Sequence, residues 1–264
     1  MTKFQAYLHL TRFHKPIGSL LLLWPTLWAL WIASSGSPDW KIVIIFILGV
    51  CFMRSAGCVI NDYADRHVDG SVERTKNRPI PSGVVSEKEA LTLFSLLCLC
   101  SFALVLMTDT QTVLLSFIGL GLAALYPFMK RYTHLPQLFL GLAFSWAIPM
   151  AYSAQGGSLS DPILWMIFVA NAFWTIAYDT YYAIVDRDDD LKVGIKSTAI
   201  LFAQYDLFII TLLQGFALSL LMWVGILESF HWPYFISLIV AAALFYLQFK
   251  QAKNRERQAC FKSF

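Results

Sequence analysis

The chain is organised as a series of long apolar segments separated by short polar connections. Continuous apolar runs such as IGSLLLLWPTLWALWI lack the two-residue alternation that is typical of a membrane barrel strand. Each segment is close to the roughly 20 residues that a helix needs to cross a bilayer. Since backbone polar groups in lipid must bond within the segment, we predict helices. Eight such spans are expected, at residues 17–35, 42–60, 90–107, 111–128, 136–154, 162–182, 207–227 and 232–249.

The composition agrees with a protein that lies mostly in lipid. Hydrophobic residues make up 58% of the chain and charged residues 14%, with a mean hydropathy of +0.60. A soluble domain has roughly 25% charged residues, so soluble, disordered and disulfide-rich secreted classes are excluded. The five cysteines have no C-x-x-C spacing, which argues against a thiolate metal site. We therefore expect an all-α integral membrane protein with one membrane domain over residues 1–264.

The basic residues predict how the helices are oriented. With eight spans, nineteen of the twenty Lys and Arg residues fall on one side of the membrane, and only Lys41 falls on the other. The positive-inside rule makes that side, with both termini, cytoplasmic. The N-terminal stretch has no cleavage site of the secretory type and is expected to be an amphipathic lead-in to the first span. Dispersed basic residues give no indication of a nucleic-acid partner. The opposite connections carry Asp39, Asp109, Asp161 and Glu228.

Two acidic clusters are the main chemical feature of the sequence. On a helix, the carboxylates of each cluster recur on one face. Several anions crowded at a membrane surface repel one another, and a divalent cation relieves that repulsion. Oxygen ligands select Mg²⁺, Ca²⁺ or Mn²⁺. The first cluster, after the second span, contains Asn61, Asp62, Asp65 and Asp69; the second, at the end of the sixth span, contains Asp179, Asp186 and Asp190.

The two clusters lie four spans apart, which predicts two four-helix halves around a central cavity that opens to the cytoplasm. Mg²⁺ is commonly held by one or two carboxylates together with substrate phosphates. Neighbouring basic residues can bind the remaining phosphate charge. Because the cavity opens into a bilayer, we expect a polyprenyl or lipid diphosphate as substrate. The basic residues concerned are Arg74, Lys76, Arg78, Lys130, Arg131, Lys192 and Lys196.

Two other interpretations of the acidic clusters remain open. Charged residues at helix ends often form a solvated face with local ion pairs, such as Asp62 with Arg66 four residues later. Carboxylates in a helix bundle are also typical of cation-coupled transporters, and repeated halves suit alternating access. Two clusters in matching positions, next to basic residues at one membrane face, favour the enzyme.

These motifs resemble those of a known superfamily. The stretch NDYADRHVDGSVERTKNRP at 61–79 resembles the N-D-x-x-D-x-x-x-D signature of UbiA-type membrane prenyltransferases. DRDDD at 186–190 is similar to the second D-x-x-x-D motif of that superfamily. Segments 15–31, 126–137 and 178–202 resemble the bacterial 4-hydroxybenzoate polyprenyltransferases within it. Members have nine membrane helices, and we expect this sequence to stop before the ninth, through truncation.

The resemblance implies a reaction. It implies Mg²⁺-dependent transfer of a polyprenyl group from polyprenyl diphosphate to 4-hydroxybenzoate, at the ring carbon ortho to the hydroxyl. This step belongs to ubiquinone synthesis at the bacterial inner membrane. Another aromatic acceptor, such as a naphthoate, homogentisate or haem, is the alternative within the superfamily, and the segments at 15–31 and 178–202 argue against it.

The resemblance also implies roles for individual residues. Arg54 or Arg12 would bind the acceptor carboxylate, and Asp179 and Asp189 would support the metal ligands. Metal ligands are expected at Asn61, Asp62, Asp65, Asp69, Asp186 and Asp190. Substrate contacts are expected from Asn61, Arg54, Lys130, Arg131, Lys192 and Lys196. The catalytic set is Asp65, Asp69, Asp186, Asp190 and Arg131, with Asp186 or Asp190 as the group that accepts the phenol proton.

Overall fold

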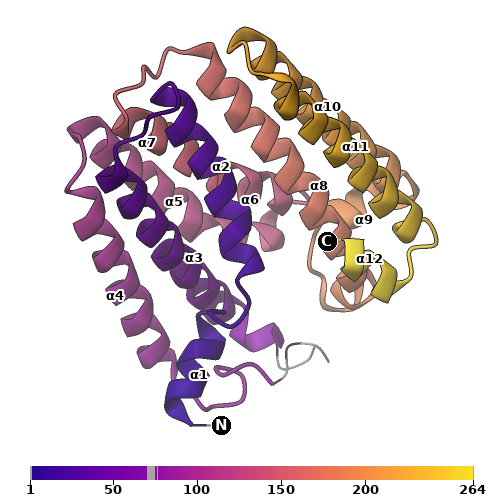
Figure 1. Ribbon diagram of the computed structural model, residues 1–264. Helices are drawn as coiled ribbons and strands as arrows, with labels where there is room; N and C mark the ends of the chain where they lie inside the picture. Colours follow the sequence, from indigo (N-terminus) through magenta and orange to yellow (C-terminus); the bar gives the residue numbers. More distant parts are fainter. Residues whose placement is uncertain (1, 70–74, 76, 264) are drawn as a thin grey trace. The chain divides into compact units, whose positions relative to one another are not determined.

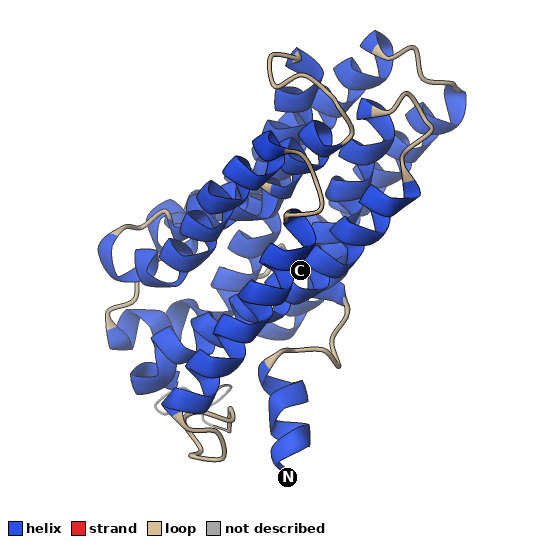
Figure 2. Cartoon of the chain, turned by 90° about the vertical axis from the view of Figure 1, so that its left-hand side faces the viewer, coloured by secondary structure: helices blue, strands red, loops and turns tan. Residues whose placement is uncertain are grey.

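The computed structural model describes residues 2–69, 75 and 77–263, with backbone only for Val68 and Asp69. This part of the chain contains helices and no strand (Figure 2), as predicted. The elements, labelled in Figure 1, are α1 (Lys3–Leu10), α2 (Ile17–Ala33), α3 (Trp40–Asp69), α4 (Glu87–Val105), α5 (Thr110–Tyr132), α6 (Pro136–Ser145), α7 (Ala147–Ala154), α8 (Pro162–Val193), α9 (Thr198–Phe202), the 3-10 helix η1 (Ala203–Tyr205), α10 (Asp206–Leu227), α11 (Trp232–Ala252) and α12 (Arg257–Ser263).

Each of the eight predicted membrane spans is mainly helical. Within the described residues, six helical stretches are long and apolar enough to cross a membrane: α3, α4, α5, α8, the run from α9 through α10, and α11. Helix α2 is apolar but only 17 residues long. The predicted span at 136–154 is divided between α6 and α7. The chain is therefore a multi-pass membrane protein.

The division of this span has a local cause in Pro149. Proline has no backbone N–H and its ring clashes with the carbonyl four residues earlier, which here belongs to Ser145. The helix stops at Ser145 and restarts at Ala147. Ser145 is fully buried, and its hydroxyl accepts a hydrogen bond of 2.9 Å from Asn171 on α8. A side chain on the neighbouring helix thus satisfies the buried hydroxyl at the break.

The chain forms two compact units. Unit 1 contains Met1–Pro127 and Ala147–Leu159, and unit 2 contains Phe128–Trp146 and Ser160–Phe264. The predicted division placed the whole segment 136–154 in the second half, whereas α7 belongs to unit 1. The break after α6 explains this difference, because α7 packs on α2 and α3 while α6 packs on α8.

In unit 1, α3 packs against α2, α4 and α1. The short N-terminal helix α1 begins with a capping box formed by Thr2 and Gln5. It lies beside α3 at one end of the unit (Figure 1) and buries Ala6 and Leu10 completely. The N-terminal stretch is thus packed into the fold. The cluster there consists of Ala6, Leu10, Val59, Ile80, Val85 and Ala90.

The connections at the two ends of unit 1 make different polar contacts. At the α1 end, Lys3 pairs with Glu89 and Arg66 pairs with Glu87 at 3.0 Å. At the other end, Asp109 precedes α5 and accepts a hydrogen bond of 2.9 Å from the backbone N–H of Thr112. Burial would raise the pKa of Asp109, but hydrogen bonds from Thr112 and Ser153 outweigh it and lower the pKa. Ion pairs therefore hold the connections at the α1 end, and a side-chain cap holds the start of α5 at the other end.

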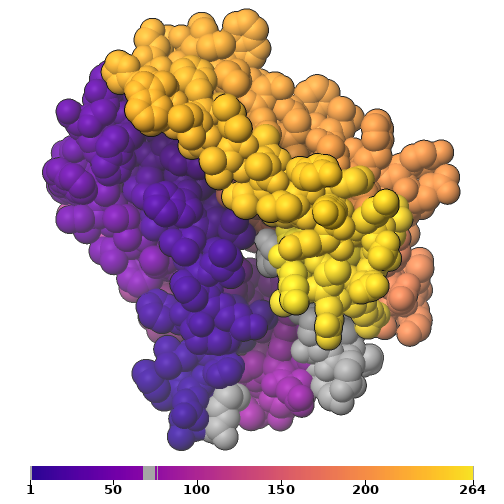
Figure 3. Space-filling view, turned by 45° about the vertical axis from the view of Figure 1, so that its right-hand side comes forward, coloured from indigo at the N-terminus to yellow at the C-terminus, as the bar shows by residue number. Residues whose placement is uncertain are grey.

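Unit 2 is built around α8, which packs against α6, α9, α10 and α12. Helix α11 packs on α10 and α12. Figure 3 shows the C-terminal part of the chain, in orange and yellow, at the surface, and several apolar side chains of α11 are exposed. Among these, Ile239 and Leu244 are 66% and 54% exposed, which suits contact with lipid tails. The buried cluster comprises Ala177, Tyr181, Ala183, Ile184, Ala199, Leu207, Ile210, Ala252 and Cys260.

A close contact between α6 and α8 gives a test of the packing in unit 2. A Cβ atom on Gly141 would lie 3.0 Å from the backbone oxygen of Ala172, which cannot move without its helix. We expect Gly141→Val to destabilise the protein by about 1–3 kcal/mol through overpacking. Gly121→Val is the matched control, because nothing lies within 4 Å of a Cβ there. Thermal unfolding in detergent measures both, and an equal effect of the two variants would contradict the packing.

Candidate functional site

The first acidic motif lies on the last turns of α3. This helix has 30 residues, so it is about 45 Å long and exceeds a hydrocarbon core of about 30 Å. The second predicted span ended at residue 60, but the helix continues through the motif. Asp62 and Asp65 are buried, with exposures of 1% and 5%, and Asn61 is partly exposed. The side chain of Asp69 lies outside the described residues.

Asp62 is held by two arginines that are distant in sequence. Its Oδ1 accepts from Arg12 Nη2 at 2.9 Å and pairs with Arg78 Nη1 at 3.0 Å. Its Oδ2 is buried and has no hydrogen-bond partner among the described residues. Arg66, the local partner considered above, pairs instead with Glu87. One carboxylate oxygen of Asp62 is therefore fixed in position, and the other can receive a cation.

Arg12 occupies an unusual backbone conformation between α1 and α2. Its φ angle is 55°, in the left-handed region that residues with a side chain rarely adopt. The backbone N–H of Arg12 donates to the carbonyl of His9 at 3.2 Å. Buried Leu10 fixes the preceding turn. The left-handed turn and this packing together hold Arg12 where its guanidinium reaches Asp62.

Arg54 lies two turns before the motif, on the face of α3 that carries Asn61. Its Nη1 donates to Cys58 Sγ, and its Nε is buried without a hydrogen-bond partner in the part of the chain described. The guanidinium lies against Gly18 on α2, where a Cβ atom would come within 2.4 Å of Arg54 Nη2. The lack of a side chain at Gly18 thus provides the space that the Arg54 guanidinium occupies.

The second acidic motif lies on the last turns of α8, a helix of 32 residues that also continues beyond its predicted span. Asp186 and Asp190 are half-buried, as is Asp179, whereas Asp188 is exposed. The helix ends at Gly194 in the left-handed conformation, with φ 72°, and the N–H of Gly194 bonds to the carbonyl of Asp190. The motif therefore has a defined helical backbone up to its last residue.

Asp189, predicted as a supporting ligand, makes ion pairs at the surface of unit 2. Its carboxylate lies 3.0 Å from Arg257 and 3.4 Å from Lys192. Lys192 is exposed and was predicted to contact substrate. The structure therefore places Lys192 beside Asp189, on the outer side of the motif.

Among the predicted phosphate-binding residues, unit 2 brings together Lys130 and Lys196. The backbone N–H of Lys196 donates to the carbonyl of Lys130 at 3.0 Å. The Lys196 ammonium donates to the carbonyl of Tyr132 at 3.3 Å, at the C-terminus of α5. Arg131 is exposed, with its guanidinium 6.0 Å from the ring centroid of Phe128. These contacts concentrate positive charge at the end of α5.

The donor set fits a hard divalent cation that also binds substrate. Among the residues whose placement is described, no three His, Cys, Asp or Glu side chains form a metal-binding group by themselves. The buried Asp62 Oδ2 offers one carboxylate oxygen from the first motif. One or two carboxylates with substrate phosphates are what Mg²⁺ typically uses. Arg74 and Lys76, predicted to bind phosphate, lie outside the described residues.

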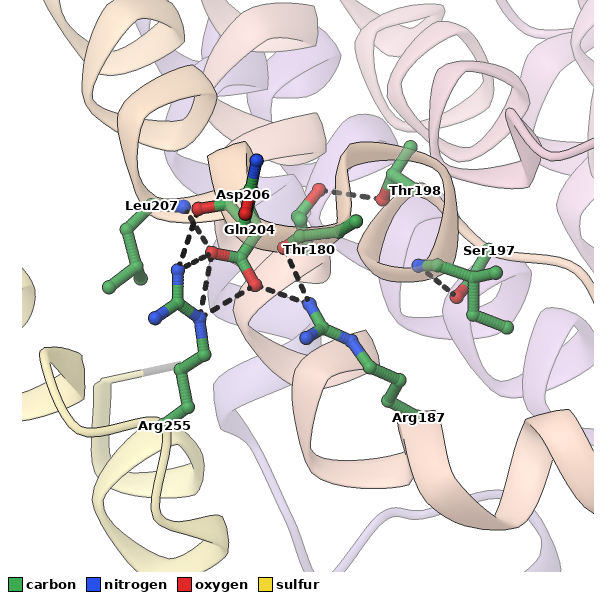
Figure 4. Close-up of polar contacts among 10 residues, drawn as sticks. Thr180, Arg187, Ser197, Thr198, Gln204, Asp206, Leu207 and Arg255 are labelled. Carbon is green, nitrogen blue, oxygen red and sulfur yellow. Dashed lines mark hydrogen bonds and ion pairs between the residues drawn. The ribbon is translucent and has the colours of Figure 1, made fainter.

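A buried ion-pair cluster in unit 2 was missed by sequence reasoning. Asp206 at the start of α10 is fully buried, and it binds Arg187 from α8 and Arg255 from the α11–α12 connection (Figure 4). In the sequence, this cluster is indicated only by one acidic residue before the apolar run 207–227. An acidic residue in that position is also typical of a helix N-terminus.

Comparison with known proteins identifies the family. The profile of the UbiA prenyltransferase family matches residues 22–264. The chain belongs to the UbiA prenyltransferase family. The resemblance inferred from the two acidic motifs is thereby confirmed.

Relatives and solved structures agree with this family assignment. A 4-hydroxybenzoate octaprenyltransferase from Marinomonas is 75% identical over 264 residues, which cover all of this chain and 93% of the relative. One from Pasteurella multocida is 59% identical and covers 99% of this chain and 90% of its own length. A UbiA homologue from Aeropyrum pernix has a TM-score of 0.83 at 26% identity, covering 93% of this chain and 92% of that one. Another from Archaeoglobus fulgidus, solved with GPP and Mg²⁺, has a TM-score of 0.77 at 18% identity, covers 98% of this chain and 94% of that one, and shares the fold.

The double pairing of Asp62 gives a prediction for this UbiA family member. Replacing Arg12 by Gln removes one charge-assisted hydrogen bond from a buried carboxylate, so we expect a loss of about 1.5–3 kcal/mol of stability. Lys15→Gln is the control, because Lys15 is exposed nearby in the α1–α2 connection. Thermal unfolding of the two variants in detergent measures the difference. Equal melting temperatures would show that Arg12 does not stabilise Asp62.

Proposed function

We propose that this protein transfers a polyprenyl group from polyprenyl diphosphate to 4-hydroxybenzoate, in the ubiquinone pathway. The observation that carries the proposal is the 75% identity to a 4-hydroxybenzoate octaprenyltransferase over the full chain. Each unit supports it separately: unit 1 carries the carboxylates of the first motif on α3, and unit 2 carries those of the second motif on α8 together with basic residues at the end of α5. Carboxylates and basic side chains of this kind suit a metal ion and a diphosphate. We further propose that residues 1–264 act as a single prenyltransferase domain.

Each acidic motif is proposed to bind Mg²⁺. From the first motif the ligands are Asn61, Asp62, Asp65 and Asp69; from the second they are Asp186 and Asp190. The buried Oδ2 of Asp62 supports a cation at the first motif. When bound, Mg²⁺ neutralises the negative charge that develops on the leaving diphosphate. Homologues solved with Mg²⁺ or with Cd²⁺ agree with a divalent cation in this family.

Basic side chains are proposed to hold the diphosphate in place. Lys130 and Arg131 at the end of α5 bind its oxygens, and Lys196 adds positive charge beside Lys130. Lys192 is a weaker candidate, because it already pairs with Asp189. Charge-assisted hydrogen bonds of this kind are stronger than neutral ones and orient the donor. With the diphosphate held in this way, the allylic C1–O bond can break and leave the allylic cation that the aromatic ring attacks.

Arg54 is proposed to bind the acceptor carboxylate. The alternative, Arg12, already donates to Asp62, whereas Arg54 has a buried Nε without a described partner. Anchoring the carboxylate orients the ring, so that the carbon ortho to the hydroxyl attacks C1 of the prenyl chain. The C1–O bond to diphosphate breaks and the ring carbon bonds to C1, while Asp186 or Asp190 accepts the phenol proton. Loss of the ring proton restores aromaticity, and the phenolate oxygen takes a proton back, so that one proton and diphosphate are released in all. The transfer requires no protein nucleophile.

The location follows from charge and family. The basic residues gather on one predicted side of the spans, which supports cytoplasmic termini and acidic motifs facing the cytoplasm. Curated relatives are bacterial. We therefore propose the bacterial inner membrane as the site of the reaction, where the apolar donor is dissolved in lipid.

The proposed reaction is tested with the protein in membranes, supplied with polyprenyl diphosphate and 4-hydroxybenzoate, with Mg²⁺ or with EDTA. We expect a prenylated hydroxybenzoate only with Mg²⁺. Asp65→Asn and Asp186→Asn each remove a ligand that stabilises the leaving group, so kcat should fall about 10²–10³-fold. Asp188→Asn is the matched control, because Asp188 is exposed and points away from the motif face.

Each contrary result identifies a different error. Equal product with EDTA would contradict the metal assignment, and equal loss in Asp188→Asn would contradict the assignment of ligands. If polyprenyl diphosphate is consumed only when another aromatic acceptor is supplied, 4-hydroxybenzoate is not the acceptor. Substrate uptake into vesicles without any prenylated product would favour the transporter.

The role of Arg54 gives a separate prediction. Arg54→Gln should raise KM for 4-hydroxybenzoate about tenfold to hundredfold, the equivalent of one lost charge-assisted hydrogen bond. KM for polyprenyl diphosphate should stay unchanged. Gly18→Ala should raise the same KM by a smaller factor, because its methyl group displaces the guanidinium. Gly57→Ala is the control, since nothing lies within 4 Å of a Cβ there. A parallel rise in both KM values would contradict this role.

A further inference from the structure

We infer that Asp206 is a positioning residue for the second acidic motif: it binds Arg187 and so keeps that guanidinium away from Asp190. The inference rests on the proposed function, in which Asp186 and Asp190 are metal ligands. It concerns an arginine inside the motif itself, DRDDD, whose positive charge opposes the binding of a cation by its neighbours.

The contacts of Asp206 show how firmly Arg187 is held. Asp206 is 0% exposed, and its Oδ2 accepts a hydrogen bond from Arg187. Arg255 donates to the same carboxylate through Nε at 3.1 Å and Nη2 at 2.7 Å. Figure 4 shows the two guanidinium groups reaching Asp206 from different elements. Two positive charges thus share one buried negative charge.

Arg255 is held by contacts with residues outside α8. Arg255 has φ 56°, in the left-handed region, and its N–H bonds to the carbonyl of Ala252 at the end of α11. Its Nη2 also donates to the carbonyl of Gln204 at 2.9 Å. The hydrogen bonds to Asp206 raise the pKa of Arg255 above its usual value. The α11–α12 connection thereby holds Asp206 in place for Arg187.

Helix geometry defines what Arg187 would do without Asp206. On α8, Arg187 lies about 100° around the helix from Asp186. Asp190 follows it by three residues, which is a spacing that allows oppositely charged side chains to pair. Arg187 also lines a cavity of ≈ 450 Å³ with Leu191, Gln204 and Arg255, so its side chain is not packed on every side. Once released, the guanidinium can pair with Asp190 and compete with a metal ion.

Two double variants with the same charge change separate this role from a structural one. Asp206→Asn with Arg255→Gln leaves Arg187 without its buried partner. Asp206→Asn with Arg187→Gln removes the competing guanidinium as well. We expect the Mn²⁺ affinity of the first variant to fall by about twofold to fivefold, which is the strength of an ion pair on a helix surface. Electron paramagnetic resonance without substrates measures this affinity. The second should bind Mn²⁺ like the unaltered chain.

The Mg²⁺ concentration for half-maximal activity should rise in the first variant and stay unchanged in the second. The melting temperature should fall in both variants. Equal Mn²⁺ affinity in the two double variants would overturn the positioning role. If one of them does not fold, two single variants decide. Asp206→Asn releases Arg187 and should weaken Mn²⁺ binding, whereas Arg187→Gln breaks the same ion pair without releasing a guanidinium and should not weaken it; weakening in both would overturn the positioning role. Absence of metal-dependent transfer in the unaltered chain would instead contradict the proposed function.

Discussion

The structure depends on how carboxylates are buried at the ends of membrane-spanning helices. An unpaired buried charge is costly, and a pair repays that cost only when geometry and hydrogen bonds are good. Each unit solves this with the same arrangement, in which one buried aspartate is shared by two arginines from other parts of the chain. In unit 1 the aspartate is Asp62, and in unit 2 it is Asp206.

The two arrangements serve their units differently. Asp62 belongs to the acidic motif itself, so its arginines position a proposed metal ligand and leave one of its oxygens available. Asp206 lies outside the motif and binds an arginine from within it. In both cases a short polar connection, rather than a membrane helix, supplies one guanidinium. The N-terminal turn supplies Arg12, and the α11–α12 connection supplies Arg255.

The sequence predicted the helices well because their apolar length is a strong local signal. It also predicted both acidic motifs, since their helical spacing requires no knowledge of tertiary contacts. Its membrane spans ended at residues 60 and 182, where hydropathy falls, and α3 and α8 continue from there through the motifs, as the helical spacing of the carboxylates predicted. The pairing of Asp62 with Arg12 could not be predicted, because it joins residues that are distant in sequence. The break before Pro149 has a local cause, but it lies inside an apolar run and leaves no mark in the hydropathy.

The left-handed backbone of Arg12 and Arg255 has a consequence for how this fold can vary during evolution. At most positive-φ positions glycine is favoured, because it adopts this conformation without steric cost. At these two positions glycine would relax the turn but remove a guanidinium from a buried carboxylate. Backbone preference and charge compensation therefore oppose each other, and the chain retains a strained residue for the sake of its side chain. Such positions restrict sequence drift more strongly than either requirement would alone.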